Sequence, residues 1–246
     1  MDDNTKRKMM VNYFKPFPKF SIWLILIGLV VAIIGGATEA GAGVIIIGII
    51  LLGLGILIIV MSTKGKATDQ QMDKWLNEMF ETITKKNALD KLGIDESELT
   101  AETLFIPGPV YWGVQGFDQS VIKRKEGKDK YYRYSTWNIE VFLMTENYLA
   151  NYGCTFNMIK NTSINEHTNE FFYKDVVSVR TATESSAYTL LDGHKLEQSQ
   201  MFQLNLAGDS VRVVTDDANL KVSSAMSSRV DKTVQAIRTM LRQKKA

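Results

Sequence analysis

Two apolar runs near the start of the chain restrict its fold more than any other feature. Residues 20–36 are apolar or small, and residues 41–61 contain no charged residue. Each run is about as long as the ~20 residues that a helix needs to cross the hydrocarbon core of a bilayer. Only Ala37-Thr38-Glu39-Ala40 separate the runs, so the two helices must be antiparallel neighbours. The sequence therefore predicts a transmembrane helical hairpin at residues 20–61.

A cleaved signal peptide is the alternative interpretation of the first run. Lys6, Arg7 and Lys8 precede it, and Ala40-Gly41-Ala42 resembles a cleavage site. The long polar segment before the run and the second apolar run directly after it both favour a retained hairpin.

The distribution of basic residues predicts the orientation of the hairpin. Lysine and arginine are frequent before residue 20 and again at residues 64–74, whereas the turn carries only Glu39. Because cytoplasmic loops are enriched in these residues, both termini are expected in the cytoplasm of a multi-pass inner (plasma) membrane protein. Residues 1–19 then form a cytoplasmic N-terminal segment. The single cysteine, Cys154, fits a reducing compartment, with strand packing expected for it rather than reactivity.

Small residues recur every seven positions along both runs, and each series lies on one helical face. The series are Ser21, Gly28 and Gly35 in the first run, and Gly41, Gly48 and Gly55 in the second. Small residues let transmembrane helices approach closely. The stripes can pack the hairpin against itself or form a homo-oligomer, and the additional Gly36, Gly43 and Gly53 favour the oligomer.

Glu39 in the connecting turn has two interpretations. If several hairpins surrounded an axis, its carboxylates would form a ring at the outer mouth of a cation-selective pore. Otherwise it is an exposed turn residue.

Residues 62–106 predict an amphipathic connecting helix region. Its apolar residues fall on one face at helical spacing: Met72, Trp75, Leu76, Met79, Phe80 and Ile83. The stripe can lie on a lipid surface, form a stalk with other subunits or pack on the following domain. The mixed charges on the opposite face favour protein packing, because helices on lipid surfaces usually carry a basic polar face.

Residues 107–246 change to the alternating pattern of an antiparallel β domain. The expected strands are 110–115, 120–125, 131–145, 148–158, 171–181, 187–191, 201–207 and 210–215, with turns at Glu146-Asn147, Asp192-Gly193 and Gly208-Asp209. Helical spacing returns in a final helix, whose apolar face is Met226, Val230, Val234, Ile237 and Leu241. The expected fold is thus a transmembrane α-hairpin followed by an α+β soluble domain.

About seven short strands followed by one amphipathic helix resemble the pleckstrin-homology (PH) superfold, including bacterial PH-like domains attached to membranes. The segment from Phe171 to Val179 also looks like a common PH-type strand. The resemblance covers residues 110–246 and implies an antiparallel β-barrel or sandwich of about seven strands with a C-terminal helix, on the cytoplasmic side.

The most chemically suggestive segment is a basic hairpin with Gly127 at its turn. It interleaves cations with aromatic residues, and its candidate ligand-binding residues are Lys123, Arg124, Lys125, Lys128, Lys130, Tyr132 and Arg133. Cations bind phosphate through charge-assisted hydrogen bonds, and tyrosine rings can stack on a base. In PH domains that bind phosphoinositides, a basic hairpin between early strands contacts the phosphates, and this segment is similar. Glu126 and Asp129 weaken the positive electrostatic field of the hairpin. A solvated hairpin without a ligand is therefore the alternative.

No catalytic motif accompanies these features. The sequence lacks G-x-x-x-x-G-K-[ST], G-x-G-x-x-G, G-x-S-x-G and H-E-x-x-H motifs. His167 and His194 fall in predicted loops without companions at metal-ligand spacing. The sequence predicts a protein that is not an enzyme and has no catalytic residue, metal or cofactor. The net charge of +2 also disfavours a general nucleic-acid binder.

Two functions fit these features. In the first, an oligomeric membrane effector senses an anionic ligand (a nucleotide, a short nucleic acid or a lipid) and acts as a channel that alters membrane permeability. This layout resembles two-transmembrane effectors of bacterial antiphage (antiviral) defence. In the second, a membrane-anchored PH-like adaptor or scaffold binds a protein partner. The glycine stripes and the basic hairpin favour the first function, and the wholly apolar spans favour the second.

Overall fold

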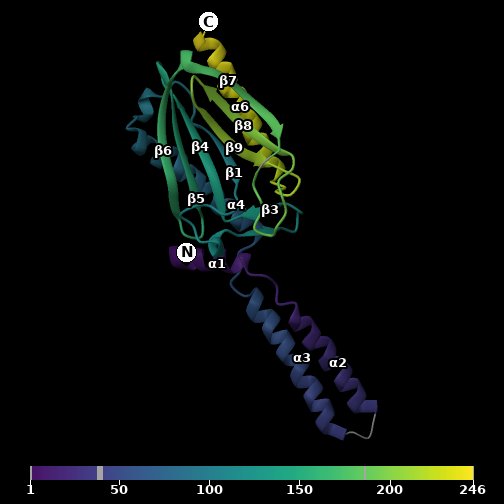
Figure 1. The fold of residues 1–246 in the computed structure, drawn as a ribbon. Coiled ribbons are helices and arrows are strands. Elements are labelled where there is room, and N and C mark those ends of the chain that lie inside the picture. Colours follow the sequence, from purple (N-terminus) through teal and green to yellow (C-terminus); the bar gives the residue numbers. More distant parts are fainter. Residues whose placement is uncertain (1, 38–40, 186, 246) are drawn as a thin grey trace. The chain divides into compact units, whose positions relative to one another are not determined.

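The structure is a computed structural model that describes residues 2–37, 41–185 and 187–245 of the chain (Figure 1). The chain divides into two compact units, Met1–Thr68 and Asp69–Ala246. Each unit is described by itself below.

The described residues of the first unit form three helices. Helix α1 (Asp3–Phe14) begins at Asp2, whose carboxylate accepts a hydrogen bond from the Thr5 amide. Helices α2 (Phe20–Ala37) and α3 (Gly41–Thr63) are both long and apolar enough to cross a membrane. They pack against each other as an antiparallel pair. The predicted pair of apolar helices is therefore present, whereas α1 was not predicted.

The second unit opens with a helical segment in three parts. Helix α4 (Asp69–Thr82) continues into a π-helical turn, η1 (Ile83–Asn87), and then into helix α5 (Ala88–Leu92). Gly93 ends the segment in the left-handed conformation, with a φ of 64°. The apolar face of α4 is buried, and the ring of Phe80 lies 5.5 Å from that of Trp137. The expectation that this face packs on protein is confirmed.

In the described residues of this unit nine strands follow, arranged in three antiparallel sheets of which none is closed. The first sheet has the order β1 (Leu104–Pro109), β4 (Thr136–Met144), β5 (Tyr148–Asn157), β6 (Thr162–Phe172). The second is the hairpin of β2 (Arg124–Glu126) and β3 (Tyr132–Tyr134). The third has the order β7 (Val176–Glu184), β8 (Ser199–Leu206), β9 (Ser210–Asp216). Short 3-10 turns lie at Glu96–Glu98, Gln119–Val121 and Tyr173–Asp175.

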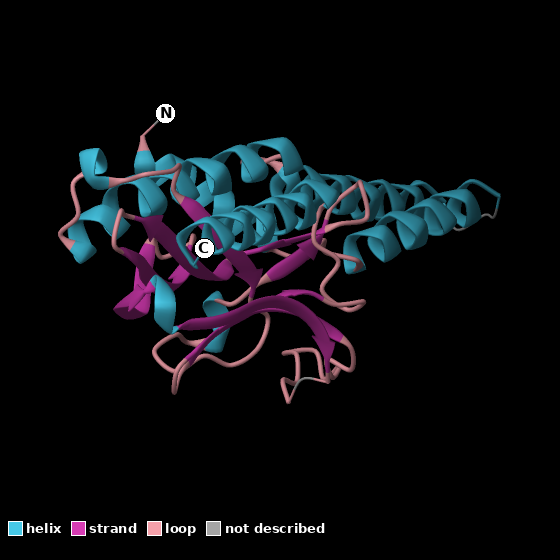
Figure 2. Ribbon diagram, turned by 90° about the horizontal axis from the view of Figure 1, so that it is seen from above, coloured by secondary structure: helices cyan, strands magenta, loops and turns pink. Residues whose placement is uncertain are grey.

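The core lies between the four-stranded and three-stranded sheets, whose strands gather in two layers in Figure 2. Helix α6 (Ser224–Lys245), yellow in Figure 1, adds its apolar face to this core and contacts β1, β7 and β9. The side chains that the helix contributes are Val230, Val234, Ile237, Met240 and Leu241. The predicted C-terminal helix is confirmed.

Two predicted strands were wrong, and one strand was missed. Residues 110–115 form no strand. The first strand is instead β1, which contains Pro107-Gly108-Pro109. Proline is tolerated there since β1 is an edge strand. Strand β6 was missed because most of its side chains are exposed and polar. The predicted strand 187–191 contributes only one isolated bridge, from Thr189 to Lys195.

Gly108 explains why a turn-like sequence occurs in β1. A side chain at this position would collide with the backbone carbonyl oxygen of Val214 and with a methyl group of Val213. The absence of a side chain therefore allows β1 to pass directly against β9.

Candidate functional site

The predicted basic hairpin is present as strands β2 and β3. Lys125 lies opposite Arg133 in the register, and the Gly127 amide donates to the carbonyl of Tyr131 to close the turn. The backbone amide of Lys128 donates to the carboxylate of Asp69, at the first residue of α4, over 2.9 Å. The tip of the hairpin is thus bound to the start of the second unit.

Arg133 is fully engaged in holding the hairpin to α4. Its guanidinium donates to both carboxylate oxygens of Asp73, at 3.0 and 2.8 Å, and to both oxygens of Asp129. The side chain is 9% exposed. These hydrogen bonds raise the pKa of Arg133, and the bond from Arg133 holds the pKa of the Asp129 carboxyl below its usual value. We call Arg133, Asp73 and Asp129 the Arg133 clamp.

Arg124 is also engaged within the protein. Its guanidinium lies 4.4 Å from the ring centre of Tyr111 and 4.6 Å from that of Tyr132. It forms an ion pair with Asp192 and donates to the backbone carbonyl of Asn219 over 2.6 Å. Tyr132, predicted as a ligand-stacking residue, therefore stacks on an arginine of its own hairpin.

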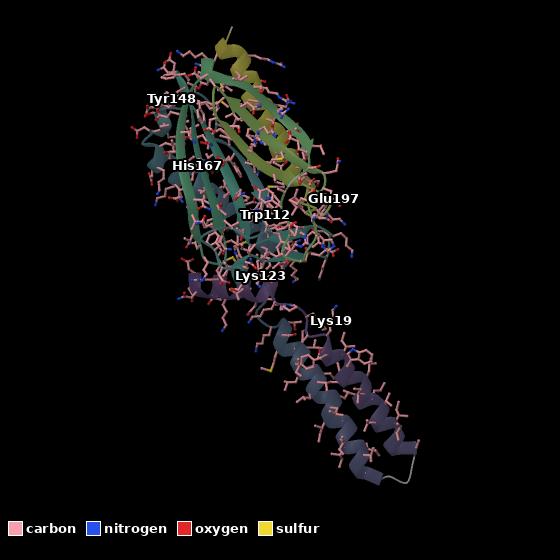
Figure 3. The ribbon with its side chains drawn as sticks, in the orientation of Figure 1. Lys19, Trp112, Lys123, Tyr148, His167 and Glu197 are labelled. Carbon is pink, nitrogen blue, oxygen red and sulfur yellow. The ribbon has the colours of Figure 1, made fainter. Side chains whose placement is uncertain are left out.

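The lysines of the hairpin differ from its arginines. Lys123, Lys128 and Lys130 are exposed, and Lys130 lies 3.5 Å from Glu126. Lys123 is labelled in Figure 3. Lys125 is half-buried. Lys123 and Lys128 present their charges to an external ligand without breaking a contact described above, whereas Lys130 would first leave Glu126.

A hollow of about 620 Å³ adjoins the tip of the hairpin. Its lining includes three carboxylates (Asp129, Asp216 and Asp217) and two lysines (Lys130 and Lys221). Burial raises the pKa of Asp216. With more carboxylates than lysines, this hollow is a poor site for an anion.

The glycine stripes lie at the contact between α2 and α3. A Cβ atom on Gly48 would lie 2.5 Å from the Ala32 backbone nitrogen, and one on Gly28 would lie 2.6 Å from the Leu52 backbone nitrogen. Gly35, Gly55 and Ser21 are buried at the same contact. Gly41 differs, since no atom lies within 4 Å of its Cβ position. Most of each stripe is therefore occupied within one hairpin.

The predicted pore-mouth residue, Glu39, lies outside the described residues. Gly36, Gly43 and Gly53 face open space. The remaining outward residues of α2 and α3 are mostly large and apolar.

His167 lies on strand β6, not in the loop that its sequence context predicted (Figure 3). Its Nε2 atom is 3.5 Å from the carboxylate of Glu140, and its ring lies over Gly153, which is paired with both residues. The contact with Glu140 raises the pKa of His167. Within the described part of the chain, no group of three or more His, Cys, Asp or Glu residues is arranged to hold a metal.

The buried thiol of Cys154 is on the adjacent strand, β5. Burial raises its pKa to about 11. The thiol is therefore protonated at neutral pH, which suits packing rather than reactivity.

The largest cavity among those described lies between α4 with its π turn, residues 96–105, and α6. Its volume is about 1120 Å³, and its lining includes Thr84, Lys85, Phe105, Arg229 and Lys232. This cavity could not be predicted from the sequence, because its three walls come from segments far apart in the chain. The single available signal was Arg229, a charge within the amphipathic pattern of the final helix.

Comparison of the chain with protein-family models, with curated proteins and with solved structures finds no match. The function is therefore inferred from the geometry of these sites.

Proposed function

We propose that this chain is a non-enzymatic, membrane-anchored binding module. Helices α2 and α3 anchor it, and the β domain binds an anionic ligand or a protein partner on the cytoplasmic side. The observation that carries the proposal is that most small residues of both stripes are buried between α2 and α3. Such a hairpin is complete by itself and presents a mainly apolar exterior, as an anchor in lipid requires.

We further propose that the β domain is PH-like. Support comes from the order of its long strands, which form one four-stranded antiparallel sheet and then one three-stranded sheet. A C-terminal helix follows and packs on the core between the sheets. The short β2–β3 hairpin falls between the first two strands of the four-stranded sheet, the place of the ligand-binding hairpin in the PH domains that the sequence resembles.

The ligand-binding role is assigned to the exposed lysines Lys123, Lys128 and Lys130. They are the hairpin cations with exposed side chains, whereas Arg124 and Arg133 stabilise the fold. Reversal of the three lysines to glutamate should remove binding to vesicles that contain anionic lipid and to nucleotides, with no loss of thermal stability. Unchanged binding by the triple variant would exclude the hairpin as the anion site.

The anchoring role is tested by the mass of the full chain in detergent and by dye release from liposomes that contain it. A monomer that releases no dye supports an anchor. A fusion reporter at the C-terminus tests the orientation, which is inferred from the basic residues on both sides of the hairpin.

An oligomeric effector that alters membrane permeability is the second candidate function. It is favoured by Gly36, Gly43 and Gly53, whose faces are open and would allow another hairpin to approach closely. A discrete oligomer that dissociates on Gly43→Leu, together with ligand-dependent dye release, would support this candidate over the anchor.

A further inference from the structure

The cavity between α4 and α6 has the size of a small-molecule site. Its volume of about 1120 Å³ is slightly above the ~300–1,000 Å³ typical of ligand pockets. Its walls all belong to the second unit. The apolar part of the lining includes Phe105 and Leu104 from strand β1.

Arg229 differs from the other inward-facing arginines. Arg124 and Arg133 each form an ion pair with a carboxylate, and the half-buried Arg238 donates to the backbone carbonyl of Val179. Arg229 is half-buried and stacks on Phe105, with its guanidinium carbon 4.9 Å from the ring centre. Throughout residues 2–37, 41–185 and 187–245, the structure gives it neither a hydrogen-bond acceptor nor a carboxylate within 4.0 Å.

This arrangement is costly for the protein alone. A guanidinium stays charged at every physiological pH, and its partial removal from water carries a desolvation cost that no protein hydrogen-bond acceptor offsets here. Burial lowers the pKa of Arg229, and the more distant Glu81 only partly opposes this effect. An anion bound in the cavity would supply the missing acceptors.

The backbone of the opposite wall gives an independent indication. The helix that begins at Asp69 changes to a π turn at Ile83–Asn87, and this turn places Thr84 and Lys85 in the cavity lining. Turns of this kind are rare and occur frequently at functional sites. The π turn and the unpaired arginine are on different elements but line the same space.

The charges of the lining restrict the ligand. Three cations (Lys85, Arg229 and Lys232) are balanced by three carboxylates (Glu81, Glu96 and Glu102). Such a lining suits one anionic group rather than a polyanion, which three carboxylates would repel. The floor formed by Phe105 and Leu104 suits an apolar group beside that anion.

We propose that the cavity binds a small organic anion, with one carboxylate or phosphate on Arg229 and an apolar group against Phe105. The ligand is either a soluble molecule or the headgroup end of a short lipid, since both supply this chemistry. The proposal concerns a site separate from the basic hairpin and does not depend on the role of the apolar helices.

The test is calorimetric titration of the full chain in a maltoside detergent, which contains no phosphate. The probes are benzoate, phenyl phosphate, inorganic phosphate and dioctanoyl phosphatidic acid. Benzoate or phenyl phosphate should bind more tightly than inorganic phosphate because of the apolar floor. Binding of phenyl phosphate or benzoate identifies a soluble ligand, and preferential binding of the phosphatidic acid identifies a lipid; either result supports the site.

Arg229→Met should weaken binding roughly 10- to 100-fold, the loss expected for charge-assisted hydrogen bonds. Arg229→Lys, which keeps the charge but loses the planar fork, should fall between this variant and the wild type. Arg242→Met is the matched control, because Arg242 is an exposed arginine of the same helix. It should bind like the wild type.

A folding measurement separates a ligand site from a structural one. Without ligand, Arg229→Met should keep the wild-type Tm or exceed it, because the substitution removes an unpaired charge from a partly buried position. The proposal is overturned if no organic probe binds at concentrations up to about 10 mM, if Arg229→Met binds as well as the wild type, or if its Tm falls.

Discussion

Substitution of Arg133 by methionine should destabilise the β domain strongly, although the hairpin that carries it was predicted as a ligand site. Methionine keeps much of the aliphatic length but removes the charge and every hydrogen bond of the Arg133 clamp. Four hydrogen bonds connect the guanidinium to Asp73 on α4 and to Asp129 on the hairpin. The change therefore separates two elements and leaves two carboxylates close together without their cation.

The size of the stability loss in Arg133→Met depends on how exposed Asp73 and Asp129 are. Charge-assisted hydrogen bonds contribute about 1.5–3 kcal/mol each, but Asp73 and Asp129 are 47% and 45% exposed and regain water when the arginine is lost. A net loss of roughly 2–4 kcal/mol is the result, less than the sum of four bonds. For a domain of this size, each 1 kcal/mol lowers Tm by about 2–4 °C.

Thermal unfolding of the full chain in detergent, followed by tryptophan fluorescence, measures this loss. Lys128→Met is the matched control, because its side chain is exposed on the same hairpin, and its Tm should not change. A loss below about 1 kcal/mol for Arg133→Met, the level of an ordinary exposed ion pair, would refute the clamp. The pKa of Asp129 is lowered in the folded state, so its stabilisation is complete above its unfolded pKa of about 4 and is lost as pH falls further. The wild type and the variant should therefore converge in stability under acid conditions.

Three further predictions concern particular positions. Gly48→Leu should separate α2 from α3, because even a Cβ atom would lie 2.5 Å from a backbone nitrogen. Cross-linking between cysteines placed on the two helices should therefore fall. Gly53 faces open space, so Gly53→Leu should leave the cross-linking unchanged. Gly108→Ala should lower the free energy of unfolding by more than about 2 kcal/mol, because β1 and β9 must move apart. An unaltered midpoint in denaturant unfolding would contradict this expectation. The contact of His167 with Glu140 raises the histidine pKa, so its stabilisation is complete below the unfolded pKa of about 6.5 and is lost as pH rises through the folded value. His167→Gln should remove this decline at pH values above the unfolded pKa, and an unchanged Tm profile would count against the pair.

The sequence predicted the elements whose pattern is local. The two apolar helices, the buried face of α4, the β8–β9 hairpin and α6 each follow from spacing within one segment. Strand β6 could not be recognised in this way, since an exposed edge strand has no buried face to impose alternation. Strand β1 was hidden because Gly108 is required by a neighbour more than 100 residues later, Val214.

The roles of the arginines were not predictable either, because their partners also lie far away in the sequence. The sequence shows a run of cations, but the partner of Arg133 on α4 is 60 positions away and that of Arg124 is 68 positions away. Whether a cation is available to a ligand depends on such distant partners. Arg229 is an arginine without such a partner. Its lack of a hydrogen-bond acceptor could not be predicted, because it depends on three separate segments that line the cavity.

The hydrogen bond from Lys128 to Asp69 has a mechanical consequence. Asp69 is the first residue after the boundary between the two units, and its carboxylate holds the backbone at the tip of the β2–β3 hairpin. Displacement of the hairpin tip would therefore break a hydrogen bond at the residue with which the second unit begins.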